Sequence, residues 1–184
     1  EMQAWARTQG YAVTRMRDGL RLDAHEFSAE LQWRRLDLAT QLDQLMLNAV
    51  DLVTASALLD LVSRDWIDEL ARRCCANRCA VLFALNYDGH VLWRPTLVAD
   101  QDIEALLNRH QGRDKGFGPA AGPAASGFTR QCLEALGFDV QQGRSDLRLI
   151  TADAKLQQAL ACGWAEAALE MDPARRSGIT AWLE

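Results

Sequence analysis

The chain has 184 residues, 49% apolar and 24% charged, which is enough for a hydrophobic core and ordinary for a globular protein. Its formal net charge of -5 leaves no basic surplus to neutralise phosphates, which weighs against nucleic acid as a partner. No apolar run is long enough to cross a bilayer and no secretory signal is present, so we expect a cytoplasmic protein with no membrane partner. The first residue is Glu1 rather than Met, so we expect that the chain begins within a longer protein or that its start is not shown.

The chain contains five cysteines, an odd number without the framework of a disulfide-rich domain, which fits a reducing compartment. Cys74, Cys75 and Cys79 are close enough in sequence to suggest a metal site. However, no histidine is near them, and Cys74 and Cys75 are neighbours in a helical pattern. We therefore interpret them as small apolar side chains of the core and predict no metal site.

The residues before the first strong strand give weak patterns. Residues 2–16 begin as a helix, and Gly10 can end it. The stretch that follows, with an apolar pattern at 20–22, can hold a short strand, and a second strand candidate lies around 31–36. The apolar spacing at 41–47 predicts a connecting helix.

Two strong strands follow, and a helix connects them. The continuous apolar run at 50–57 is typical of a parallel strand covered on both faces, and 79–87 has the same character. Between them, Ser63 is positioned to cap a helix that carries acidic residues in its first turns and arginines near its end. Asp88-Gly89 closes the second strand with a turn. The order strand, helix, strand predicts a parallel pair joined by a right-handed crossover.

The second half of the chain alternates helices with less regular segments. Residues 100–111 and 128–137 predict helices, and Gly137 ends the second one. Residues 113–127 are rich in glycine and proline and predict a long ordered loop. Two strand-like segments flank Gly143 and predict a β-hairpin over 138–150.

A long alanine-rich helix at 152–170 and a short helix that starts at Pro173 complete the chain. From this order we expect one partial domain over residues 1–184. Its expected fold class is α/β, a doubly wound and mostly parallel sheet that ends in an antiparallel β-hairpin.

This order resembles the later part of a class I S-adenosylmethionine-dependent methyltransferase. DLVTASALLDLVS at 51–63 is similar to the fourth strand and its loop, and CAVLFALNYDG at 79–89 to the fifth strand, which ends beside the substrate. LEALGFDVQQGRSDLRLI at 133–150 resembles the closing helix and hairpin, and WRRLDLA at 33–39 lies where the third strand delivers an acid near the adenine. NRHQGRDKGFGPAAGP at 108–123 is similar to a bacterial subgroup of the family.

The resemblance implies a Rossmann-like methyltransferase fold without its N-terminal strands. The glycine-rich loop of the family, which holds the cofactor S-adenosylmethionine, has no counterpart in this chain, and glycines 116, 118 and 122 come too late to replace it. The implied function is methyl transfer to an unidentified small-molecule substrate, with this chain as the later segment of the enzyme. The alternative is a non-catalytic binding or scaffolding module that completes its sheet by oligomerisation, for example as a homodimer.

The resemblance assigns four residues to the cofactor. Asp37 would accept a hydrogen bond from the adenine amino group, and the backbone of Leu38 would meet the ring. Ala55 and Ser56 would line the methionine part. The alternatives are local: Asp37 caps the helix expected after it, and Ser56 caps the next turn.

Two further residues would face the substrate because they follow the strong strands, where ligands bind in open α/β sheets. Asp60 can act as a base or as a partner for a cation near the sulfonium; otherwise it is an ordinary acid in the first turn of a helix. Tyr87 can position a substrate with its hydroxyl, or it can be a half-buried structural tyrosine.

The glycine-rich loop adds a mixture of residue types that is rare in a plain connector, and we expect it to face the substrate through His110, Gln111, Asp114, Lys115 and Phe117. The alternative is that Asp114 and Lys115 are solvated and that His110 caps a helix C-terminus. The segment lacks the pattern of a phosphate-binding loop. No catalytic residue is assigned, since methyl transfer needs mainly alignment and exclusion of water.

Overall fold

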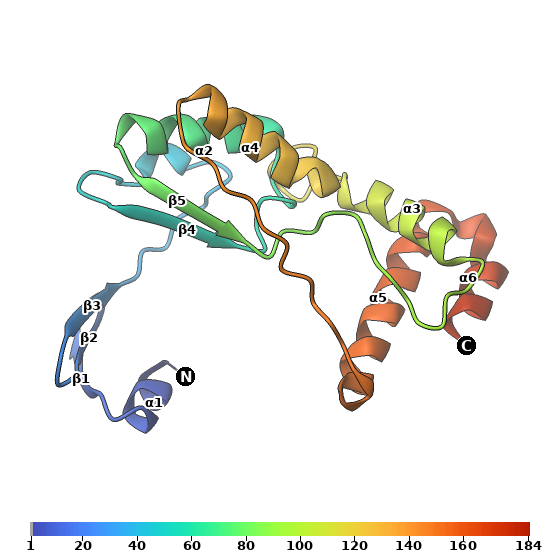
Figure 1. The fold of residues 1–184 in the computed structure, drawn as a ribbon, viewed down its shortest axis with the longest axis horizontal. Coiled ribbons are helices and arrows are strands. Elements are labelled where there is room, and N and C mark those ends of the chain that lie inside the picture. Colours follow the sequence, from blue (N-terminus) through green and yellow to red (C-terminus); the bar gives the residue numbers. More distant parts are fainter. Residues whose placement is uncertain (1) are drawn as a thin grey trace. The chain divides into compact units, whose positions relative to one another are not determined.

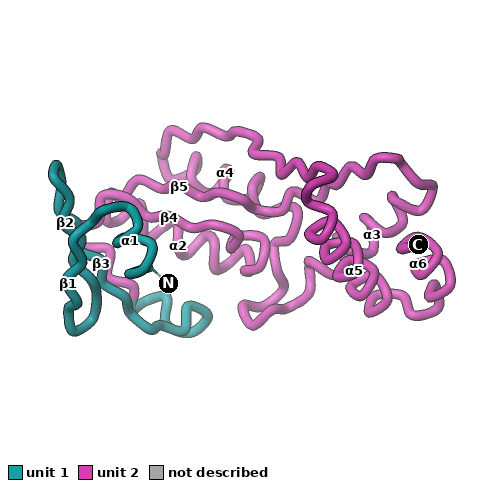
Figure 2. Tube along the Cα trace, turned by 90° about the horizontal axis from the view of Figure 1, so that it is seen from below, with its two compact units in different colours: residues 1–44 teal, residues 45–184 magenta. Residues whose placement is uncertain are grey.

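The computed structural model describes residues 2–184 and divides the chain into two compact units, Glu1–Gln44 and Leu45–Glu184 (Figure 2). Each unit has its own secondary structure and its own buried side chains. Within residues 2–184, no helix combines the length and hydropathy that a membrane span requires.

The first unit is a three-stranded antiparallel sheet with one short helix. Its elements are α1 (Met2–Thr8), β1 (Ala12–Met16), β2 (Gly19–Asp23), β3 (Ser28–Gln32) and the 3₁₀ turn η1 (Leu42–Gln44). The strand order is β1-β2-β3, and both pairings are antiparallel.

Short connections explain why this sheet is antiparallel. Met16 pairs directly with Gly19, so two residues join β1 to β2, and the Ala24 N–H donates to the Phe27 carbonyl at 2.9 Å in the turn between β2 and β3. Connections this short cannot form the crossover that a parallel pair needs. Leu20 and Leu22 alternate along β2 and are buried, which gives the sheet one apolar face.

The second unit contains a two-stranded parallel sheet and five α-helices among its described residues. In chain order its elements are β4 (Leu52–Ser56), α2 (Arg64–Ala76), β5 (Ala80–Ala84), α3 (Asp100–Gln111), η2 (Gly122–Ala124), α4 (Ala125–Ala135), η3 (Thr151–Asp153), α5 (Ala154–Met171), η4 (Pro173–Arg175) and α6 (Arg176–Leu183).

The predicted strand, helix, strand unit is confirmed, with shorter strands than expected. β4 and β5 pair in parallel with Leu52 opposite Ala80 and Ser56 opposite Ala84. Ser63 caps α2: its Oγ accepts a hydrogen bond from the Trp66 N–H at 3.2 Å. Helices α2 and α4 lie next to each other over one face of this sheet (Figure 1).

Helices α3, α5 and α6 form the other packed part of the second unit. Their contacts bury a cluster of apolar side chains: Ile103, Leu106, Ala165, Ala168, Ile179 and Trp182. The Trp182 Nε1–H donates to Asp100 Oδ1 at 2.8 Å and joins the last helix to the start of α3. The predicted helices at 100–111, 128–137 and 152–170 and the last short helix are therefore confirmed, with boundaries that shift by a few residues.

The predicted fold class is wrong. The strands form one antiparallel sheet of three and one parallel sheet of two, and not a doubly wound, mostly parallel sheet. The predicted hairpin over 138–150 is also wrong, since no strand lies there. Leu147 and Ile150 are 75% and 67% exposed, and no side chain of residues 138–150 is fully buried. A hairpin without a buried apolar face is only marginally stable.

Two smaller expectations in the first unit also need correction. The strand expected around 31–36 lies at Ser28–Gln32, and the helix expected at 41–47 is the single 3₁₀ turn η1. The backbone after Gln32 instead turns through Asp37, whose carbonyl accepts hydrogen bonds from the N–H groups of Thr40 and Gln41.

Candidate functional site

Three loops converge after the carboxyl ends of β4 and β5. We name them the β4 loop (57–63), the β5 loop (85–92) and the glycine-rich loop (112–124), and together the loop cluster. The Leu59 N–H donates to Asn86 Oδ1 at 3.2 Å, which joins the β4 and β5 loops. The N–H groups of Ala121 and Gly122 donate to the carbonyls of Val62 and Asp60 at 2.7 and 3.0 Å, which joins the glycine-rich loop to the β4 loop.

Asn108 of α3 holds the β5 loop against this helix. The Tyr87 hydroxyl donates to Asn108 Oδ1 at 2.8 Å, and Asn108 Nδ2 donates to the Gly89 carbonyl at 3.0 Å. Gly89 has a φ of +87°, and a Cβ placed on it would lie 2.7 Å from Cβ of Pro123 in the glycine-rich loop. The two loops therefore approach each other as closely as a glycine permits.

Asp60 carries the most unusual polar group of the cluster. Its exposed fraction is 7%, and within residues 2–184 its Oδ1 atom is buried without a hydrogen-bond partner. Gln111 Oε1, at the end of α3, is also buried without a hydrogen-bond partner among the described residues. A buried oxygen of this kind is costly unless a donor reaches it, so each of these two atoms can accept a hydrogen bond that the described residues do not supply.

Tyr87 is a hydrogen-bonding group and not a base near neutral pH. Burial, followed by the nearby charges of Glu104 and Asp88, raises its pKa from 10.0 to about 12. The phenol therefore keeps its proton and donates it to Asn108. Its observed contact fits the structural role that the sequence left open.

The glycine-rich loop is anchored and folded by two of the predicted residues. Asp114 Oδ1 accepts hydrogen bonds from the N–H groups of Gly116 and Gly118 at 2.7 and 3.0 Å, which fixes the local turn. The Phe117 ring packs edge to face on Trp66 of α2, with centroids 5.9 Å apart. The first contact folds the loop on itself, and the second holds it against α2. Lys115, between these two residues, is partly buried.

His110 lies in the last turn of α3 and points toward α5. Its Nε2 lies 3.3 Å from Glu170 Oε2, and the Arg113 Nη1 lies 2.5 Å from the same oxygen. The hydrogen bond from Arg113 lowers the pKa of Glu170, so the carboxylate stays charged beside both groups. His110 and Arg113 therefore both approach the carboxylate of Glu170, which ties the end of α3 to the end of α5.

The four predicted cofactor residues fall in two groups. Asp37 and Leu38 belong to the first unit, where Asp37 Oδ1 accepts a hydrogen bond from the Ala39 N–H at 3.0 Å and stabilises its own turn. Ala55 and Ser56 end β4 in the second unit; Ser56 is exposed and Ala55 is half-buried on the opposite face. Their contacts with a cofactor stay predictions.

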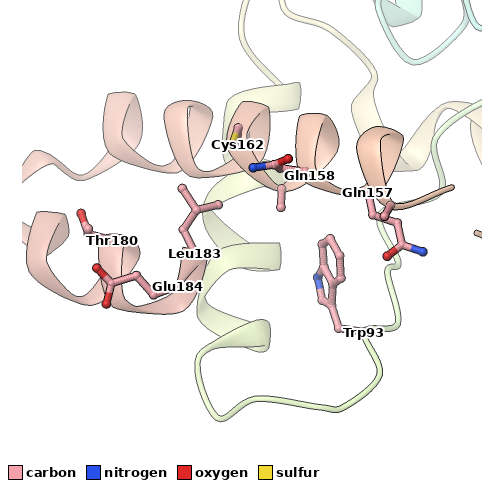
Figure 3. Close-up of a pocket in the computed structure, with 9 residues that line it drawn as sticks. Trp93, Gln157, Gln158, Cys162, Thr180, Leu183 and Glu184 are labelled. Atoms are coloured by element: carbon pink, nitrogen blue, oxygen red, sulfur yellow. The ribbon is translucent and has the colours of Figure 1, made fainter. Parts of the chain in front are cut away.

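A cavity that the sequence did not suggest lies among α5, α6 and the segment before α3 (Figure 3). Its volume is about 620 Å³, and its lining includes Trp93, Gln157, Cys162 and Leu183. Trp93 packs edge to face on Trp164 and Trp182. No sequence pattern could have revealed this cavity, because its lining comes from segments far apart in the chain and contains none of the predicted site residues. The same reason applies to Asn108, whose contacts arise only in the folded chain.

The described residues contain no group of three His, Cys, Asp or Glu side chains that could hold a metal ion. No protein-family model, no curated protein and no solved structure matches this chain.

Proposed function

We propose that this chain takes part in methyl transfer from S-adenosylmethionine to a small molecule, and that the loop cluster is its ligand site. The observation that carries the proposal is the convergence of three loops, after the carboxyl ends of two parallel strands, around the buried and unpartnered Oδ1 of Asp60. In open α/β sheets, ligands bind beyond the carboxyl ends of the strands. The resemblance of residues 51–63 and 79–89 to a methyltransferase supports a ligand site at the same edge of the sheet.

The loop cluster offers an acceptor for a positively charged group of the cofactor. S-adenosylmethionine carries a sulfonium and an ammonium group, and the carboxyl oxygen of Asp60 is an acceptor that can face either cation. The cofactor supplies the reactive methyl group. This chain's residues bind and orient: Tyr87 and Asn108 fix the β5 loop, and the anchored glycine-rich loop limits the access of water to Asp60.

Calorimetric titration with S-adenosylhomocysteine tests the proposal. We expect saturable binding to this chain and weaker binding to Asp60→Asn, which removes the charge at nearly constant volume. Asp65→Asn is the matched control, because Asp65 lies five positions on, in the exposed first turn of α2, and has no place in the loop cluster. The absence of any binding heat with the folded wild-type chain would contradict the loop cluster as a site for the cofactor.

The second candidate function is a scaffolding module that completes its sheet with another copy. The unpaired edges and the exposed face of the β4–β5 sheet favour it. Within residues 2–184, β4 and β5 pair only with each other, and Leu52 and Leu82 on the face away from α2 are 48% and 58% exposed. Parallel sheets are normally covered on both faces, and unpaired strand edges attract other strands. Light scattering after size-exclusion chromatography would show a dimer that Leu82→Lys dissociates; a monomeric wild-type chain would remove this candidate.

A further inference from the structure

The cavity among α5, α6 and the segment before α3, which we name the Trp93 cavity, is lined by a carboxylate. Among the described residues of its wall, Glu184 is the one charged side chain, and none is Lys, Arg or His. No ion pair within residues 2–184 includes Glu184. The charge of this wall therefore favours a cation as the ligand, since an anion would be repelled by the carboxylate.

Trp93 gives the same cavity a fixed aromatic wall. Its ring packs edge to face on Trp164 and Trp182, with centroids 5.3 and 5.5 Å apart. These contacts hold the indole in place before a ligand binds, so binding costs little side-chain freedom. Trp93 stands on one side of the cavity, and Leu183 and Glu184 lie on the other (Figure 3). A molecule that fills the space between them can contact both the ring and the carboxylate.

We propose that the Trp93 cavity binds a small organic cation of the quaternary ammonium type, with its charge between Trp93 and Glu184. The face of an indole ring attracts cations, and quaternary ammonium groups are typical ligands of such rings. Ala154, Ala161 and Leu183 make much of the remaining wall apolar, which suits the methyl groups of such a cation. A primary ammonium group would instead need acceptors for three N–H donors.

The size and the polar groups of the Trp93 cavity fit a ligand of this class. Its volume of about 620 Å³ is within the range of small-molecule sites. Gln158 and Thr180 also line it and can form hydrogen bonds with a polar substituent of the ligand. The cavity shares no lining residue with the loop cluster, so the inference goes beyond methyl transfer and does not depend on it.

NMR titration of the isotopically labelled chain with choline tests the need for charge. The comparison ligand is dimethylbutanol, the neutral analogue in which carbon replaces the nitrogen. We expect choline to shift the indole N–H signal of Trp93 and the amide signals of Ala161 and Cys162 saturably. Dimethylbutanol should bind about three- to thirtyfold more weakly, because it loses the attraction to the ring and to the carboxylate. Equal affinities for the two ligands, or no saturable shift with choline, would overturn the proposal.

Substitutions at the two sides of the cavity test the residues. Glu184→Gln removes the charge of an exposed side chain and should weaken choline binding about three- to tenfold. Glu166→Gln is the matched control, because Glu166 is an exposed acid of α5 that does not line the cavity. It should bind choline as the wild type does. Equal weakening in both variants would mean that choline responds only to the net charge of -5, and would exclude Glu184 as its partner.

The aromatic wall is tested by the ratio of the two affinities. Trp93→Leu keeps an apolar wall without a ring, so it should weaken choline binding about three- to thirtyfold and change dimethylbutanol binding much less. Trp93→Phe keeps a ring against Trp164 and Trp182 and should give an intermediate affinity for choline. If Trp93→Phe, in a folded chain, weakens the binding of both ligands equally, the ring does not attract the cation.

Cys162 offers an independent check of where the ligand binds. It lines the Trp93 cavity, whereas Cys132 lies in α4 and does not; both are free and partly buried. Saturating choline should slow the modification of Cys162 by iodoacetamide and leave the rate at Cys132 unchanged, as measured by mass spectrometry. An unchanged rate at Cys162 would place the bound choline outside this cavity and overturn the assignment.

Discussion

Replacement of Gly89 by alanine tests whether the β5 loop and the glycine-rich loop meet as the structure shows. Gly89 has a φ of +87°, which costs a residue with a Cβ about 1–2 kcal/mol. The new Cβ would lie 2.7 Å from Cβ and 3.1 Å from Cγ of Pro123, whose ring is too stiff to swing aside. Overpacking of this kind costs about 1–3 kcal/mol. The two effects together should lower the free energy of unfolding by about 2–5 kcal/mol.

Gly127→Ala is the matched control, since it adds the same methyl group in α4 with no atom within 4 Å. It should raise the free energy of unfolding by about 0.5–1 kcal/mol, because alanine favours helix more than glycine. Urea unfolding followed by circular dichroism measures both variants. Adding Pro123→Gly to Gly89→Ala should recover the packing part of the loss but not the backbone part. If Gly89→Ala unfolds at the same urea concentration as the wild type, the two loops do not touch at this point.

Three further predictions use the same unfolding assay or simple chemistry. In a double-mutant cycle, the effects of Tyr87→Phe and Asn108→Ala on the free energy of unfolding should differ from additivity by about 0.5–1.5 kcal/mol. Additive effects would be evidence against a hydrogen bond between the two side chains. The raised pKa of Tyr87 means that the unfolded chain loses this proton first, so stability should fall as the pH rises from 10.0 to about 12, with a smaller fall in Tyr87→Phe. Cys74 and Cys79 are buried, and burial raises the pKa of Cys74 to about 11. Iodoacetamide should therefore modify Cys162 before either of them. Equal rates of modification, measured by mass spectrometry, would contradict their burial.

Much of the second unit follows from local patterns. Ser63 before an amphipathic run predicts the start of α2, and the apolar run at 79–87 predicts β5; the structure confirms both. These elements are predictable because caps and hydrophobic periodicity act over a few residues. The pairing of the two strands in parallel follows as well, since the connecting helix is long enough for a crossover.

The candidate site was predictable only as a region. Strand order predicts that Asp60 and Tyr87 follow the same edge of the sheet, and the mixture of residue types in the glycine-rich loop predicts that it faces the substrate. The structure brings these three loops together. Which of them is bonded and which is unpartnered could not be predicted. Asp114 bonds its own turn, whereas Asp60 has an oxygen without a donor, although both are single acids beside a loop.

The amino-acid sequence by itself determined where helices and strong strands form in residues 50–137 and at the end of the chain, because these depend on neighbours along the backbone. Tertiary structure decided the rest. It left 138–150 without a hairpin and its leucine and isoleucine exposed, and it made the first sheet antiparallel through two short turns. A strand is stable only when another strand and an apolar surface accept it, and a buried polar atom is satisfied only by a partner in space; neither condition is visible in the order of residues.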